Sequence, residues 1–214
     1  MKDVFRKAAK GLFDEGLVSA FSGSLSVRDG DRIFTTSQNA MLSDLSDDDV
    51  IEVPLADNSG SGASREIIVH RAIYQNSSAK AIIQATPAFA ISLSINENKI
   101  LPQDAHGQTF LKSIPVVKVR DPLASQELAR MLPSVFKSSY VSAVVKGYGS
   151  FVIASDLIEA YKLTSCLERS CKVLYLSKKN QPQPSRSWED KKRHHTTGIP
   201  PGIGVMDRSR YRKR

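Results

Sequence analysis

The hydrophobic and polar positions of residues 1–177 switch repeatedly between a helical period and a strand-like period. Apolar residues three and four apart predict helices, whereas short alternating or continuous apolar runs predict strands. We therefore expect helices over residues 2–15, 64–76, 87–95, 125–132 and 156–176. Short strands are expected over residues 25–28, 32–35, 51–55, 81–83, 114–119, 141–145 and 151–153.

Turn and capping residues refine these elements. Asp29-Gly30-Asp31 separates two short strands and is typical of a tight β-hairpin. Pro87 suits the first position of a helix, and Asp156 suits the N-cap of the last one. Because helices and strands interleave around a hairpin, we predict an α/β fold with a mixed, largely antiparallel central sheet flanked by helices.

The character of the chain changes after residue 177. Periodic hydrophobic positions stop, and prolines, glycines and arginines replace them. We predict two regions, a folded domain over residues 1–177 and a basic, extended Pro/Gly/Arg-rich tail over residues 178–214.

Charge divides the chain at the same place. The sequence has 30 Lys and Arg residues and 22 Asp and Glu residues, and 11 of the basic and 3 of the acidic residues lie in 178–214. Residues 1–177 keep 19 of each sign and are neutral, so the whole net charge of +8 belongs to the tail. Any nucleic-acid or acidic partner is therefore expected to bind through the tail, over residues 186–214.

Two further patterns bear on the class of protein. No apolar run approaches the roughly 20 residues that cross a membrane, and the N-terminus lacks the pattern of a signal peptide, so we expect a cytoplasmic protein with no membrane partner. Cys166 and Cys171 are five apart in a predicted helix and point to different sides, which argues against a disulfide between them.

Several segments together resemble the class II aldolase/adducin family. They match, in order, that family's Ser-Gly-Asn-Leu-Ser-Val-Arg loop, its Ile-Thr-Pro-Ser turn, its Ser-Ser-Glu helix start followed by His-x-Ala-Ile-Tyr, its Ala-Val-Val-His-x-His strand and its Gly-His-Gly turn. The matching segments are Ser22-Gly23-Ser24-Leu25-Ser26-Val27-Arg28, Phe34-Thr35-Thr36-Ser37, Ser64-Arg65-Glu66 with His70-Arg71-Ala72-Ile73-Tyr74, Ala81-Ile82-Ile83-Gln84-Ala85-Thr86-Pro87 and Lys146-Gly147-Tyr148-Gly149-Ser150-Phe151.

This resemblance implies a three-layer α/β fold and a chemistry. In active family members three histidines hold a divalent metal, usually zinc, which stabilises the enediolate formed when a sugar-phosphate carbon–carbon bond breaks. A glutamate beside the metal acts as acid and base, and a loop of small polar residues holds the phosphate. Family members are commonly homo-oligomers, often tetramers, so the resemblance also implies a homo-oligomer here.

The metal-ligand positions depart from the family pattern. The three histidine positions fall on Gln84, Thr86 and Tyr148, whose amide and hydroxyl groups are poor zinc ligands. We therefore expect no metal cofactor. Residues 1–177 contain two histidines, and we interpret His70 as a structural helix residue; His106, in a predicted loop, is the one histidine left to approach the site.

The acid/base and phosphate positions are better kept. By this resemblance, Glu66 stands at the position of the family's catalytic glutamate. The alternative is that Glu66 is only a solvated carboxylate, favoured by the dipole at the start of a helix. Arg65 adds a guanidinium suited to phosphate, beside an expected helix N-terminus. The resemblance places the phosphate site on Gly23, Ser24, Ser37, Gln38, Ser64 and Arg65.

Three hypotheses follow from this reading. The first is a degenerate family member that lacks zinc-dependent aldol cleavage and still binds a phosphorylated small molecule. The second is an active sugar-phosphate lyase that uses metal ligands outside the family pattern. The third is an oligomeric scaffold that binds RNA or protein through its basic tail, in which Tyr211 would stack on a base.

Overall fold

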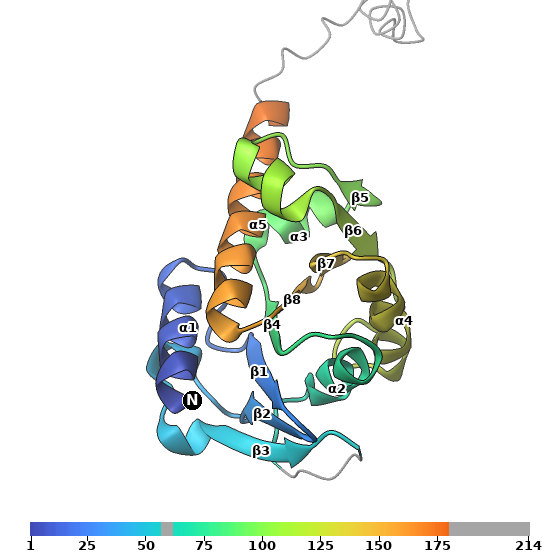
Figure 1. The fold of residues 1–214 in the computed structure, drawn as a ribbon. Helices are drawn as coiled ribbons and strands as arrows, with labels where there is room; N and C mark the ends of the chain where they lie inside the picture. Colours follow the sequence, from blue (N-terminus) through green and yellow to red (C-terminus); the bar gives the residue numbers. More distant parts are fainter. Residues whose placement is uncertain (57–61, 180–214) are drawn as a thin grey trace, which may run out of the picture. The chain divides into compact units, whose positions relative to one another are not determined.

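The structure is a computed structural model that describes residues 1–56 and 62–179. Its strands form a sheet in the order β3-β2-β1-β4-β8-β7-β6-β5 (Figure 1). Their bounds are β1 Ser24–Asp29, β2 Arg32–Thr36, β3 Val50–Pro54, β4 Ala81–Ala85, β5 Lys99–Ile100, β6 Ile114–Val117, β7 Ser142–Val145 and β8 Gly149–Ala154.

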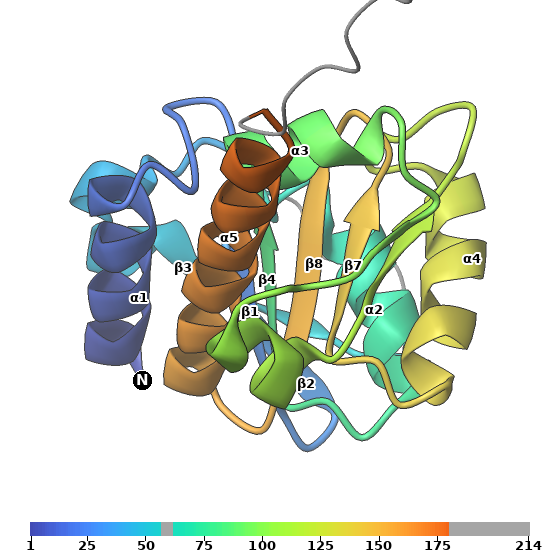
Figure 2. The ribbon, with the colours of Figure 1, turned by 90° about the horizontal axis from the view of Figure 1, so that it is seen from above.

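Helices cover both faces of this sheet (Figure 2). On one face α2 and α4 pack against each other, and on the other α5 lies between α1 and α3. Their bounds are α1 Lys2–Asp14, α2 Ile67–Asn76, α3 Ala88–Ser94, α4 Gln126–Lys137 and α5 Leu157–Lys179, with short helical turns η1 Leu42–Asp44, η2 Asp47–Asp49 and η3 Gly107–Leu111. The predicted three-layer arrangement is confirmed.

The pairing of the strands confirms the predicted mixed sheet. β1 and β2 form the expected hairpin, in which Asp29 pairs with Arg32 around a turn where Gly30 has a φ of +59°. β6 and β7 are parallel, whereas the other paired strands in the described residues run antiparallel.

Apolar side chains fill the space on each side of the sheet. The central strand β4 is buried along its whole length, and its successive residues alternate between faces. Ile82 packs in the core beneath α2 and α4, together with Ile73, Leu132 and Phe151. Its neighbour Ile83 packs in the opposite core, beneath α1 and α5.

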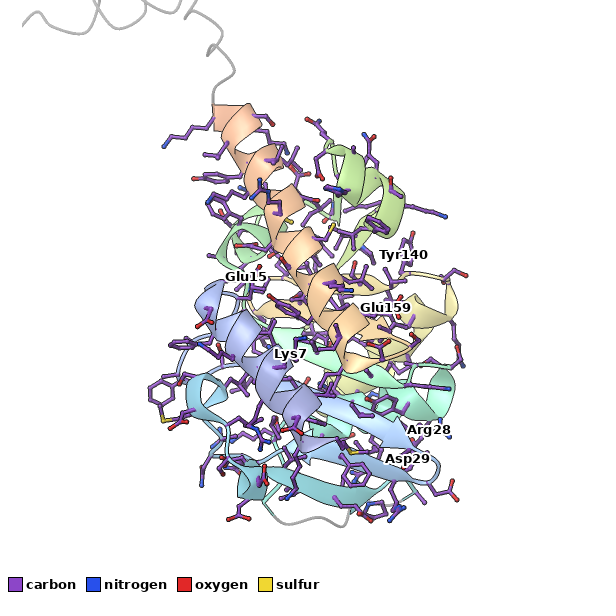
Figure 3. The ribbon with its side chains drawn as sticks, turned by 60° about the vertical axis from the view of Figure 1, so that its left-hand side comes forward. Lys7, Glu15, Arg28, Asp29, Tyr140 and Glu159 are labelled. Carbon is purple, nitrogen blue, oxygen red and sulfur yellow. The ribbon has the colours of Figure 1, made fainter. Side chains whose placement is uncertain are left out.

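Hydrogen bonds join α1 to α5 across their exposed edges. Glu15, labelled in Figure 3, lies directly after α1. It accepts hydrogen bonds from the hydroxyls of Tyr161 and Ser165 on α5. Gly11 in α1 lets the two helices approach, because a Cβ there would lie 2.6 Å from the Tyr161 ring. α1 therefore packs against one side of α5, whose other contacts include those with α3, β4 and β8.

Two helix starts differ from the prediction. α2 begins at Ile67 rather than at Ser64, because residues 64–66 form a turn in which the Ile67 amide donates to the Ser64 carbonyl at 3.0 Å. α3 begins at Ala88, and Pro87 precedes it in an extended conformation instead of taking the first helical position.

Two helix ends also differ. α4 continues past Leu132 to Lys137, because Pro133 lies inside the helix and does not end it. α5 extends to Lys179, beyond the predicted domain boundary at residue 177. β5 and η3 were not predicted, since the first has two residues and the second lacks a clear apolar period.

The predicted tail lies almost wholly outside the described residues, so its division from the domain stays a prediction. Within residues 1–56 and 62–179, no helix has both the length and the apolar character needed to cross a membrane. Cys166 and Cys171 both lie on α5 and are free thiols, as expected.

Candidate functional site

A cavity of about 460 Å³ gathers most of the residues that the sequence singled out. It lies where the end of β4, the β7–β8 turn and the loops before β1 and α2 meet. Its lining residues are Ala20, Phe21, Ser22, Gly23, Ser37, Gln38, Asn39, Ala40, Ser64, Arg65, Glu66, Gln84, Thr86, Leu123 and Tyr148.

The strand pairing explains why distant segments meet there. β4 pairs with β1 on one side and with β8 on the other, so Gln84 lies opposite both Ser24 and Phe151. Gly149, which begins β8, approaches β4 so closely that a Cβ would lie 2.3 Å from the Ala85 carbonyl oxygen. This close approach brings the turn that carries Tyr148 next to the end of β4.

Glu66 and Tyr148 form the central contact of the cavity. The Tyr148 hydroxyl donates a hydrogen bond to Oε1 of Glu66, a residue that is 5% exposed. Oε2 of Glu66 is buried and has no hydrogen-bond partner among the described residues. Burial raises the pKa of Glu66 to about 7, although the Tyr148 hydroxyl and the nearby Ala124 amide oppose the rise.

Gln84, Thr86 and Tyr148, the positions that the sequence resemblance assigns to the family's histidines, make contacts of other kinds. The Gln84 side chain is buried, and its amide donates weakly to the Ala85 carbonyl at 3.4 Å. The Thr86 hydroxyl lies 2.7 Å from that of Ser22. Burial raises the pKa of Tyr148, and the negative charge of Glu66 adds to the rise, so its hydroxyl keeps its proton at neutral pH.

Ser64 and Arg65 are the cavity residues best suited to an anion. The Ser64 hydroxyl accepts a hydrogen bond from the Glu66 amide at 3.3 Å, which leaves its own proton for a ligand. Arg65 is exposed, and α2 begins two residues after it. Of the described residues that line the cavity, Arg65 is the one cation and Glu66 the one acid.

The other predicted phosphate residues take different places. The Ser37 hydroxyl donates to Asp49 at 3.1 Å, so its proton is engaged within the fold. Gln38 is exposed on the cavity wall, and Gly23 lines it with a φ of +107° that a side chain would rarely adopt. Ser24 is buried on β1 and is not part of the lining.

His70 lies outside the cavity and agrees with its structural interpretation. Its ring is fully buried, and Nδ1 lies 2.8 Å from the Ser26 hydroxyl, which also lies 2.8 Å from the Tyr74 hydroxyl. Burial lowers the pKa of His70 to about 3, so the ring stays neutral at physiological pH.

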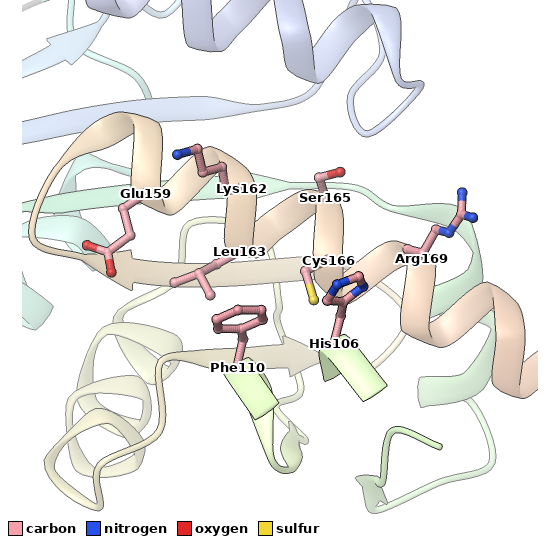
Figure 4. Close-up of a pocket in the computed structure, with 8 residues that line it drawn as sticks. All are labelled: His106, Phe110, Glu159, Lys162, Leu163, Ser165, Cys166 and Arg169. Carbon is pink, nitrogen blue, oxygen red and sulfur yellow. The ribbon is translucent and has the colours of Figure 1, made fainter. Parts of the chain in front are cut away.

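His106 lies in a second groove, between η3 and α5 (Figure 4). Its ring stacks near that of Phe110, with centroids 6.2 Å apart, and the two rings face Leu163 and Cys166 on α5. The groove shares no residue with the cavity around Glu66. His106 therefore does not approach the site.

Sequence reasoning missed the apolar part of the cavity. Phe21 and Leu123 line it, and so do Ala20 and Ala40, in loops without a periodic pattern. The position of Phe21 directly before Ser22-Gly23-Ser24 was a usable signal. Leu123 gave none, because the segment before α4 reaches the cavity only through the tertiary fold.

Comparison with known proteins identifies the family to which these segments are similar. Residues 4–175 match the model of the class II aldolase and adducin N-terminal domain. The chain is 29% identical to an L-fuculose phosphate aldolase of Methanococcus maripaludis over 174 residues, which cover 80% of this chain and 94% of the relative. It is also 29% identical to an L-fuculose phosphate aldolase of Methanocaldococcus jannaschii over 178 residues, covering 82% and 96% of the two chains.

Solved structures show the same relationship. The crystal structure of L-fuculose-1-phosphate aldolase from Thermus thermophilus superposes with a TM-score of 0.81 and 31% identity, covering 86% of this chain and 98% of that one. YgbL from Escherichia coli has a TM-score of 0.77 at 19% identity, covering 90% of this chain and 96% of that one, and shows the shared fold alone.

Proposed function

The chain belongs to the class II aldolase and adducin family, and we propose that it binds a phosphorylated small molecule in the cavity around Glu66 without a zinc ion. The observation that carries this proposal is the hydrogen bond from Tyr148 to Glu66. Tyr148 stands where the sequence resemblance expects a metal ligand, and its hydroxyl is engaged by the neighbouring carboxylate.

The donor set does not suit zinc. Zinc sites in proteins are built from imidazole, thiolate and carboxylate groups. The corresponding groups here are the amide of Gln84, the hydroxyl of Thr86 and the protonated phenol of Tyr148. Thr86 is further engaged by Ser22, so two of the three groups already have partners within the cavity wall.

The charge of the cavity supports an anionic ligand. Arg65 supplies a permanent positive charge, and Ser64 supplies a hydroxyl proton. Because the pKa of Glu66 is raised to about 7, its carboxyl is largely neutral below that pH and opposes an anion little. Phosphate monoesters are the ligand class that the named relatives act on, which supports the same choice.

Glu66 also retains the means for proton transfer. A carboxyl with a pKa near the working pH is populated in both protonation states and can give or take a proton. Zinc-dependent cleavage of a carbon–carbon bond relies on the metal ion as an electrophile. The uncharged side chains of Gln84, Thr86 and Tyr148 provide no equivalent of it. We therefore propose a binding site with residual acid/base capacity and without the family's lyase activity.

The test is a thermal melt of the EDTA-treated full-length protein with inorganic phosphate and with glycerol 1-phosphate. At ten times its Kd, a ligand stabilises the folded state by about 1.4 kcal/mol, which raises the Tm by roughly 3–6 °C. Arg65→Ala is expected to abolish the shift, whereas Arg130→Ala on the exposed face of α4 leaves it intact. A wild-type Tm that stays constant at millimolar phosphate contradicts the proposal.

A further inference from the structure

The most exposed large apolar side chain of the described residues lies at the cavity mouth. Phe21 is 104% exposed and lines the cavity, whose floor includes Glu66 and Gln84 at 5% and 2% exposure. Leu123, at 55% exposure, lines the same cavity from the segment before α4. We call Phe21 and Leu123 the apolar rim. These two residues place exposed apolar side chains beside the polar groups of the same cavity.

The turn that carries Phe21 is held in place by hydrogen bonds. The Ser19 amide donates to the Ser22 hydroxyl at 2.8 Å, and the Phe21 amide donates to the Ser19 hydroxyl at 3.3 Å. The Ser22 hydroxyl reaches the Thr86 hydroxyl at 2.7 Å, and the Thr86 amide donates to the Leu17 carbonyl at 2.9 Å. The cavity wall therefore fixes the backbone that presents this ring.

The segment that carries Leu123 is constrained as well. Ala124 has a φ of +49°, a left-handed conformation that residues with a side chain rarely adopt. The Leu123 amide donates to the Asp121 carboxylate at 3.3 Å, and the Ala124 amide approaches the Glu66 carboxylate. The strained segment joins the rim to the cavity floor.

We propose that the ligand of this cavity carries a flat apolar or aromatic group next to its phosphate, and that Phe21 and Leu123 hold this group at the mouth. The proposal rests on the proposed function, because Arg65 and Ser64 bind the phosphate of the same molecule. Arg65 is also exposed at the cavity wall, so charge and apolar surface lie together there. Aryl phosphates present both features on adjacent atoms.

The experiment compares phenyl phosphate with glycerol 1-phosphate by isothermal titration of the EDTA-treated full-length protein. The two probes share a phosphate monoester and differ in the ring. Stacking and burial of the ring should lower the Kd of phenyl phosphate roughly tenfold relative to glycerol 1-phosphate. Phe21→Ala should bring the two Kd values to within about twofold, and Leu123→Ala should reduce the difference partly.

The control is Phe110→Ala, because Phe110 is 55% exposed and lies in the separate groove between η3 and α5. It should leave the preference for phenyl phosphate unchanged. Equal Kd values for the two probes in the wild-type protein would overturn the proposal while leaving phosphate binding itself intact. Absence of binding by either probe would overturn the proposed function and this proposal together.

Sedimentation of the same variants distinguishes two roles for Phe21, contact with a ligand and contact with a second copy of the chain. The proposal expects Phe21→Ala to have the mass of the wild-type protein. If Phe21→Ala lowers the sedimenting mass and keeps the preference for phenyl phosphate, Phe21 contacts a neighbouring subunit and the proposal is wrong.

Discussion

At the scale of single residues, the decisive pair is Glu66 and Tyr148. A buried carboxyl group favours its neutral form, because ionisation inside the protein loses the solvation that water supplies. The tyrosine hydroxyl moderates this effect by donating to Oε1, yet the pKa of Glu66 stays raised to about 7. Glu66 thus gives the cavity a net charge that depends on pH in the neutral range.

This predicts how Glu66 affects stability. The pKa of Glu66 is about 7 in the folded protein and about 4.5 in the unfolded chain, so between these values the folded protein holds more protons. The contribution of Glu66 to the free energy of unfolding therefore declines as the pH rises from about 4.5 to 7. Glu66→Gln removes that decline. From pH 5 to pH 8, the free energy of unfolding of the variant should rise by about 2–3 kcal/mol relative to that of the wild-type protein. Urea denaturation at each pH measures this difference.

His70 does not disturb this comparison. The pKa of His70 is lowered to about 3, so below about pH 6.5 the unfolded chain binds more protons than the folded protein. The contribution of His70 to the free energy of unfolding therefore rises with pH, whereas that of Glu66 falls. The contribution of His70 is the same in the wild-type protein and in the variant, so it cancels when their free energies of unfolding are subtracted. A difference in unfolding free energy that is constant from pH 5 to pH 8 would show that Glu66 titrates normally.

At the scale of elements, the sequence predicted contacts within a segment better than contacts between segments. Asp156 caps α5 as expected, accepting from the Glu159 amide at 2.8 Å. The cap of α3 comes instead from Glu168 on α5, which accepts from the amides of Phe89 and Ala90 at 2.8 and 2.9 Å. No local pattern around Pro87 reveals such a partner, because it lies in another helix.

The same distinction applies to the candidate site. Resemblance to the family located Glu66, Arg65 and Gln84 on the cavity, since their motifs lie in the segments that the sheet brings together. It also placed Ser24 in the phosphate site, whereas this residue is buried in β1 and does not line the cavity. The apolar rim was not predicted, because exposed loop residues follow no period and only the fold shows what they surround.

At the scale of the whole molecule, charge separates the two predicted regions. The domain of residues 1–177 is neutral, and the positive charge of the chain lies in residues 178–214. The cavity and the tail therefore support different functions, a local anion site in one and attraction to polyanions in the other. The anion site is a proposal from the cavity, and attraction to polyanions stays a prediction from the sequence.

Truncation after Lys179 tests that prediction. The truncated chain should stay folded, since α5 ends there and the apolar cores lie within residues 1–179. It should lose whatever RNA affinity the full chain has, and that affinity should weaken steeply with salt because counterions are released. In the full chain, a loss of ~1 kcal/mol on Tyr211→Ala would indicate base stacking. RNA binding by the truncated chain equal to that of the full chain contradicts the prediction.

The central claim is a phosphate-binding cavity without zinc, and the zinc content of the purified, untagged protein tests it most directly. Elemental analysis should find far less than one tightly bound zinc ion per chain. The variant Gln84→His, Thr86→His and Tyr148→His, with the family's imidazoles restored, should bind zinc more tightly than the wild-type protein under the same conditions. One zinc ion per chain, retained through gel filtration by the wild-type protein and by the chain truncated after Lys179, would contradict the claim.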